Sequence, residues 1–98
     1  MHKKIYRVIA FQNVSPYTLA ITFDDDSVQT IDFEPILYGP LYGPLRDLTF
    51  FSQVRLDPNF HTLVWPNDAD FDPETLHDWP RHQAMWIAAA KQWPSESA

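Results

Sequence analysis

The stretch WPNDADFDPETL, residues 65–76, decides the fold because it contains both the exit from a strand and the start of a helix. Its first four residues, Trp65 to Asp68, combine Pro, Asn and Asp, which is the composition of a tight turn. The sequence therefore predicts that the last strand ends near Trp65 and that a tight turn leads away from it.

The second half of the stretch predicts a helix N-terminus. Asp72 can accept hydrogen bonds from the free amides of the first turn, Pro73 suits the first helical position, and Glu74 favours the positive end of the helix dipole. Phe71 and Leu76 have the spacing of a hydrophobic staple. These features agree, so we expect a helix that starts directly after Asp72.

Acidic side chains alternate through the same stretch, as they do in calcium-binding loops: Asp68, Asp70, Asp72 and Glu74. A calcium loop of the helix-loop-helix kind needs Gly at its sixth position and Glu at its twelfth. Those positions hold Pro73 and Trp79. The pattern therefore favours a capped turn with a solvated acidic face, and no metal site is expected.

The segment before residue 34 predicts a β-hairpin preceded by another strand. Ile5–Val14 is rich in β-branched and aromatic residues, and Tyr17–Phe23 alternates large apolar residues with the smaller Thr18, Ala20 and Thr22. The turn Asp24–Ser27 then leads to a strand in which Ile31 and Phe33 alternate with polar residues. Three consecutive antiparallel strands are expected.

The middle of the chain predicts short elements. We expect one helical turn at Glu34–Leu37, a short helix within Leu45–Phe51, and strands at Gln53–Asp57 and His61–Trp65. With no long crossover helix between strands, antiparallel pairing is favoured. The predicted fold class is α+β: a small antiparallel sheet of about five strands with short helices and a C-terminal helix.

The run LYGPLYGPL repeats Leu-Tyr-Gly-Pro at residues 37–40 and 41–44. Gly39 and Gly43 are each followed by Pro, so the backbone is expected to turn twice. Two interpretations stay open. The run is either a structured loop that covers a sheet edge or an aromatic-lined binding loop around Tyr38 and Tyr42.

The C-terminal segment predicts an amphipathic helix, because Trp79, Trp86 and Trp93 are seven residues apart. Pro80 stands early in this helix and Pro94 is expected to end it. A helix this short must dock its Trp face on the chain's own sheet or on a partner. We therefore assign a single domain to residues 1–80, with a C-terminal helix and tail at 81–98.

Composition excludes several classes of function. The 98 residues suit one domain, and the absence of cysteine excludes disulfides, thiolate zinc sites and cysteine nucleophiles. A net charge of −6 disfavours direct binding to nucleic acid. No segment has the length of a membrane span or the pattern of a signal peptide, so a soluble, cytoplasmic protein is expected.

No residues are assigned to catalysis, to a cofactor or to a metal. His77 and His82 would lie about 140° apart on a helix, whereas helical zinc ligands are spaced by three or four residues. Neither a nucleophile elbow nor a glycine-rich phosphate loop is present, because Gly39 and Gly43 are each joined to Pro. We expect a protein that is not an enzyme.

Several of these segments together resemble a known family: Tyr17–Phe23 with Asp25 and Asp32, Gly43–Asp47, Phe51 and above all WPNDADFDPETL. The chain resembles the bacterial family known as domain of unknown function 2442 over about residues 5–78. The resemblance implies a compact α+β domain on an antiparallel sheet. It also implies that some relatives act in two-gene modules of toxin–antitoxin type, and it brings no catalytic residues.

The chain departs from that family pattern at two turns. Relatives usually have Asp-Gly where Asp25 and Asp26 stand, and Trp-Pro-Asn-Gly where the fourth position here is Asp68. Asp tolerates a left-handed backbone better than most residues do, so both turns are expected to survive at a modest cost in stability.

The expected function is a non-catalytic protein–protein interaction module, with the antitoxin-like half of a two-gene module as its specific form. One alternative is a small-ligand-binding domain or weak enzyme with a cleft near LYGPLYGPL, lined by Tyr38, Tyr42 and Trp65. Another is a structural protein that self-assembles through Trp86 and Trp93. The candidate partner-binding residues are aromatic and come from the C-terminal segment and the LYGPLYGPL run: Trp79, Trp86, Trp93, Tyr38 and Tyr42. The partner is expected to be another protein or a second copy of the chain.

Overall fold

The computed structural model describes residues 6–92 of the chain. Its elements follow one another as strands β1 (Val8–Ser15), β2 (Thr18–Phe23) and β3 (Val28–Asp32), the 3₁₀ turn η1 (Glu34–Ile36), helix α1 (Gly39–Tyr42), the 3₁₀ turn η2 (Gly43–Arg46), helix α2 (Leu48–Phe51), strands β4 (Arg55–Asp57) and β5 (Thr62–Val64), and helices α3 (Pro73–His77) and α4 (Trp79–Ala90). The α+β class predicted from the sequence is confirmed.

The five strands form two antiparallel sheets, whereas a single sheet was predicted. One sheet has the order β1-β2-β3 and the other is the hairpin β4-β5. Strands β4 and β5 are three residues each and pair with each other. The Val8 N–H donates to the His61 carbonyl at 2.8 Å, so the start of β1 is tied to the turn of the second hairpin.

The predicted hairpin is present, with the turn at residues 24–27 joining β2 to β3. Along β2 every second side chain is buried, as its alternating sequence predicts. Strand β1 begins at Val8 in the described part of the chain, and Phe33 lies just beyond β3, at the start of η1. Ile5, the predicted start of the first strand, lies outside the described residues.

Aromatic side chains fill the core between the sheets and the helices. Phe33, Phe51, Trp65, Phe71 and Trp79 are all 5% exposed or less. Phe33 has its ring centroid 5.2 to 6.1 Å from those of the other four, so it lies at the centre of the cluster. Burial of several large rings supplies much of the apolar area that stabilises a domain of this size.

The turn after β5 forms as predicted. The Asp68 N–H donates to the Trp65 carbonyl at 2.9 Å, and the Trp65 N–H donates to the Ala69 carbonyl at the same distance. Asp68 has φ of 68°, and so does Asp26 in the β2–β3 turn. Both turn positions are therefore left-handed in this chain, and Asp occupies them, as predicted from the sequence.

The predicted helix start is also confirmed. Helix α3 begins at Pro73, and the Asp72 carboxylate accepts a hydrogen bond from the Thr75 N–H at 3.3 Å. Phe71 and Leu76, the two residues of the predicted staple, are both buried in the same core cluster.

The repeat LYGPLYGPL is helical over much of its length. The predicted backbone turn is present at Gly39 and absent at Gly43. Gly39 has φ of 88°, which is a true turn, but Gly43 has φ of −55° and continues from α1 into η2. Pro fits the early positions of both short elements because it lacks the N–H that those positions leave unbonded.

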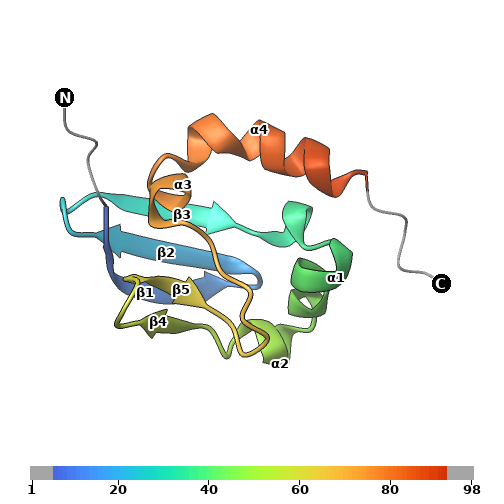
Figure 1. Cartoon of the computed structure of the whole chain (residues 1–98), viewed down its shortest axis with the longest axis horizontal. Coiled ribbons are helices and arrows are strands. Elements are labelled where there is room, and N and C mark those ends of the chain that lie inside the picture. Colours follow the sequence, from blue (N-terminus) through green and yellow to red (C-terminus); the bar gives the residue numbers. More distant parts are fainter. Residues whose placement is uncertain (1–5, 93–98) are drawn as a thin grey trace.

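Helix α4 lies on the β3 side of the molecule and runs toward α1, as Figure 1 shows. It starts at Trp79, so the boundary drawn at residue 80 falls inside its first turn. Lys91 caps its C-terminal end, and Pro94, the predicted terminator, lies outside the described residues. Within residues 6–92 no helix has the length and apolar character that crossing a membrane requires.

Candidate functional site

The second Leu-Tyr-Gly-Pro unit packs directly against the stretch 65–76. The Tyr42 hydroxyl donates to the Asp70 carbonyl at 2.7 Å, and the Asn67 side-chain amide donates to the Leu41 carbonyl at 2.9 Å. The Tyr42 ring stacks on Phe71 with centroids 4.9 Å apart. Burial, reinforced by the nearby charge of Asp70, raises the pKa of Tyr42 to about 12.

Helix α4 meets this assembly through Trp86. The indole of Trp86 lies edge-on to Tyr42, with centroids 5.7 Å apart, and 5.2 Å from Phe71. Trp86 is half-buried, whereas Trp79 is 5% exposed and packs on Phe33 and Phe71. The predicted Trp stripe therefore divides: Trp79 belongs to the core, and Trp86 reaches the surface.

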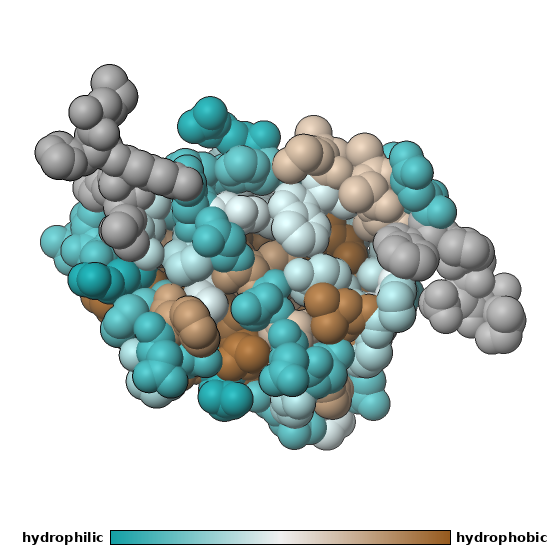
Figure 2. Space-filling view, viewed as in Figure 1, coloured by the Kyte–Doolittle hydropathy of each residue, from teal (hydrophilic) through white to brown (hydrophobic). Residues whose placement is uncertain are grey.

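An apolar groove of about 190 Å³ lies between α4 and the repeat. It is lined by Ile36, Tyr38, Gly39, Pro40, Leu41, Tyr42, Trp86, Ala89 and Ala90. Leu41 is 42% exposed at this groove. Figure 2 shows tan and brown apolar side chains gathered over α4 and on the neighbouring surface at its α1 end. The Arg46 guanidinium lies over the Tyr38 ring, 5.0 Å from its centroid.

The groove brings together three of the five predicted partner-binding residues, namely Tyr38, Tyr42 and Trp86. Trp93 lies outside the described residues. Trp65 does not line the groove, contrary to the cleft proposed from the sequence. It is fully buried, and its indole N–H donates to the Phe51 carbonyl at 2.9 Å.

A second, larger cleft of about 620 Å³ lies between the start of β1, the β4–β5 turn and residues 70–74. Its walls carry both signs of charge, with Arg7 together with Asp70, Asp72 and Glu74. The Asp72 carboxylate already caps α3, and Phe60, also on the wall, is 73% exposed. Sequence reasoning did not predict this cleft, because its walls come from three separate parts of the chain.

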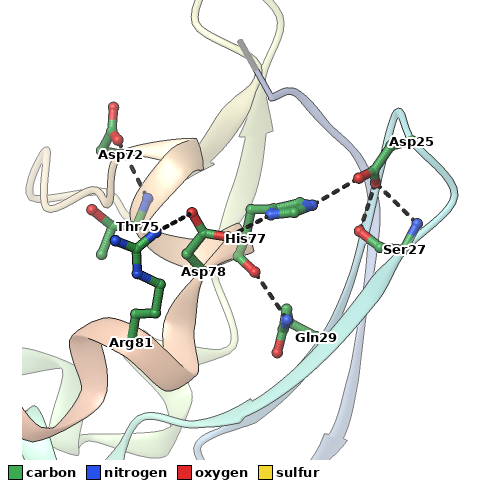
Figure 3. A network of polar contacts seen from close by, with 8 residues as sticks. All are labelled: Asp25, Ser27, Gln29, Asp72, Thr75, His77, Asp78 and Arg81. Carbon is green, nitrogen blue, oxygen red and sulfur yellow. Dashed lines mark hydrogen bonds and ion pairs between the residues drawn. The ribbon is translucent and has the colours of Figure 1, made fainter. Parts of the chain in front are cut away.

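His77, at the end of α3, has a carboxylate close to each of its two ring nitrogens. Its Nε2 lies 2.8 Å from an Asp25 carboxylate oxygen, and its Nδ1 lies 2.9 Å from an Asp78 oxygen. Figure 3 shows the imidazole between the two carboxylates, with Asp25 also held by Ser27. The Ser27 and His77 hydrogen bonds lower the pKa of Asp25.

This arrangement limits what His77 can do chemically. A general base needs a ring nitrogen free to take a proton from a substrate, and both nitrogens already face carboxylates. Within residues 6–92, no three His, Asp or Glu side chains are grouped as ligands for a metal ion. No local sequence pattern indicates the Asp25–His77 contact, because 52 residues separate the two.

The structure thus defines the class of protein: a small antiparallel α+β domain with an apolar groove beside its C-terminal helix. Residues 8–82 match the model of the family described as protein of unknown function (DUF2442). The chain belongs to this family. Searches of curated proteins and of solved structures found no match to it.

Proposed function

We propose that this domain is a non-catalytic protein-interaction module and that a partner protein docks in the groove between α4 and the LYGP repeat. The observation that carries the proposal is the convergence of Tyr38, Tyr42 and Trp86 around an apolar depression with the exposed Leu41 beside it. Tyr and Trp are enriched among residues that dominate binding energy at protein interfaces.

The size of the groove favours a side chain of a partner over a free metabolite. Small-molecule sites usually have volumes of roughly 300–1,000 Å³, and the groove has about 190 Å³. A pocket of that size suits one or two apolar side chains, presented by a helix or an extended segment. The partner is therefore expected to insert a residue such as Leu, Ile or Met.

The charges beside the groove indicate which residues of the partner flank its inserted apolar side chain. Arg46 lies over Tyr38, and Lys91 directly follows Ala90 of the groove wall. Both are cationic in a chain whose net charge is −6. A partner segment that carries an apolar side chain next to carboxylates would complement both the apolar groove and the two cations beside it. Such a segment on the product of an adjacent gene would fit the antitoxin-like role that the resemblance implies.

The test is to co-express the domain with the product of its neighbouring gene and to measure the complex by size-exclusion chromatography with light scattering. Leu41→Asp places a charge in the groove, and Leu48→Asp is the matched control. The two leucines are similarly exposed, at 42% and 46%, but Leu48 does not line the groove. The complex should be lost or weakened at least tenfold with Leu41→Asp and kept with Leu48→Asp.

A complex that survives both substitutions equally would place the interface elsewhere, and failure to bind any protein would end the proposal. Two alternatives have their own measurements. A metabolite that raises the melting temperature would support a small-ligand site. Sedimentation of the wild type as a dimer, and of Trp86→Ala as a monomer, would support self-assembly through α4.

A further inference from the structure

We infer that His77 is a proton-dependent latch that ties the junction of α3 and α4 to the β2–β3 turn. A neutral imidazole has one N–H and can donate to only one carboxylate, whereas an imidazolium donates to two. Asp25 and Asp78 lie within 2.9 Å of opposite ring nitrogens. The observed contacts with both therefore belong to the protonated ring.

The latch joins segments that are distant in the sequence. Asp25 belongs to the β2–β3 turn, while His77 ends α3 and Asp78 immediately precedes α4. The Gln29 side-chain amide on β3 also donates to the His77 carbonyl at 2.9 Å. The side chain and the backbone of one residue thus connect the helical junction to both the turn and the strand that follows it (Figure 3).

Aromatic rings hold the imidazole in place. Tyr6, just before β1, stacks on it with centroids 3.5 Å apart and an interplanar angle of 11°. Phe23, at the end of β2, meets it edge-on at 5.0 Å. Only 15% of the His77 side chain is exposed. A cation stacked on an electron-rich ring gains further stabilisation, which again favours the protonated form.

The charged groups around the ring are mostly acidic. Asp25 faces it from the β2–β3 turn and Asp78 from the helical junction, while Tyr6 is the titratable group on the β1 side. Arg81 of α4 lies 4.0 Å from Asp78, but its side chain is 80% exposed. Asp24, in the same turn as Asp25, accepts a hydrogen bond from the Arg7 backbone N–H.

These surroundings act on the pKa of His77 in opposite directions. Burial lowers it, but the hydrogen bonds and charges of Asp78 and Asp25 together outweigh burial, so the pKa lies above 6.5. A histidine with a raised folded pKa stabilises the fold fully below its unfolded pKa, and this stabilisation is lost as pH rises through the folded value. Alkaline pH should therefore break one of the two contacts between the His77 ring and the carboxylates and weaken the link between the α3–α4 junction and the β2–β3 turn.

The test follows the His77 ring by nuclear magnetic resonance, and unfolding by urea, from about pH 6 to about pH 9. In the wild type the ring should titrate with a midpoint above 6.5, and the urea midpoint should fall across that titration. His77→Gln should remove this fall. His82→Gln is the matched control, because the His82 side chain on α4 makes no hydrogen bond or ion pair within residues 6–92. This variant should behave as the wild type does.

A second variant covers the case in which His77→Gln does not fold. Asp25→Asn keeps the size of the side chain and removes its charge, so it should lower the His77 midpoint while the ring can still be observed. The inference is overturned if His77 titrates at or below 6.5 in the wild type. It is also overturned if the midpoint is the same in Asp25→Asn, or if His77→Gln keeps the wild-type dependence on pH.

Discussion

Replacing Trp65 by Phe tests whether this residue belongs to the core or to a ligand-facing cleft. Its side chain is fully buried among the rings of Phe33, Phe51 and Phe71. The substitution keeps an aromatic ring at the site. It removes the indole N–H that donates to the Phe51 carbonyl at 2.9 Å, together with the volume of the second ring.

The expected loss in free energy of unfolding is about 2 to 3 kcal/mol. The missing hydrogen bond accounts for about 0.5 to 1 kcal/mol, at the low end of the usual range, because the Phe51 carbonyl still accepts from the Val54 N–H at 3.3 Å. The missing volume of roughly 40 Å³ leaves a cavity that costs about 1 kcal/mol. The lost transfer of apolar surface from water adds about another 1 kcal/mol.

Urea unfolding followed by circular dichroism measures this difference. With a slope of about 1 to 3 kcal/mol per molar urea, the midpoint should fall by roughly 0.7 to 3 M. Phe60→Leu is the control, because Phe60 is 73% exposed and its substitution should change stability by less than about 0.5 kcal/mol. A loss below about 1 kcal/mol for Trp65→Phe would show that the indole is not sealed in the core, and the described packing would be wrong.

Two other substitutions test the contacts of the stretch 65–76. Tyr42→Phe removes the hydrogen bond to Asp70 and should cost about 1 kcal/mol in urea unfolding. In the wild type, ultraviolet absorbance should show Tyr42 ionising near pH 12. The stability that the neutral Tyr42 hydroxyl contributes should be complete below pH 10 and lost as pH rises through 12. Ionisation of Tyr42 near pH 10 would contradict its burial. Asp68→Gly should keep or slightly raise stability, whereas Asp68→Val should lower it by about 1 to 2 kcal/mol, because the backbone φ of residue 68 is 68°. Equal effects of the two substitutions would refute a left-handed turn at this position.

Local sequence signals predicted the elements whose causes are local. The cap at Asp72 and the staple of Phe71 and Leu76 depend on neighbours within a few residues, so the start of α3 could be read directly. The alternation along β2 also follows from one strand alone. The division into two sheets could not be predicted in this way, because it depends on which strand edges meet after folding.

The candidate site was only partly predictable for the same reason. Aromatic composition pointed to Tyr38, Tyr42 and Trp86, but the sequence could not show that Trp79 packs inward while Trp86 reaches the surface. The contact between His77 and Asp25 joins residues 52 positions apart. Spacing rules compare residues on one element, so they have no means of detecting such a pair.

The central claim is that a partner protein occupies the groove between α4 and the LYGP repeat. The most direct measurement is photo-crosslinking in the domain co-expressed with the neighbouring gene product. Benzoylphenylalanine replaces Leu41 in the groove or, in a second variant, Leu48 outside it. The claim predicts a crosslink to that protein from position 41 and none from position 48. Equal crosslinking from both positions, or crosslinking from position 48 alone, would contradict it.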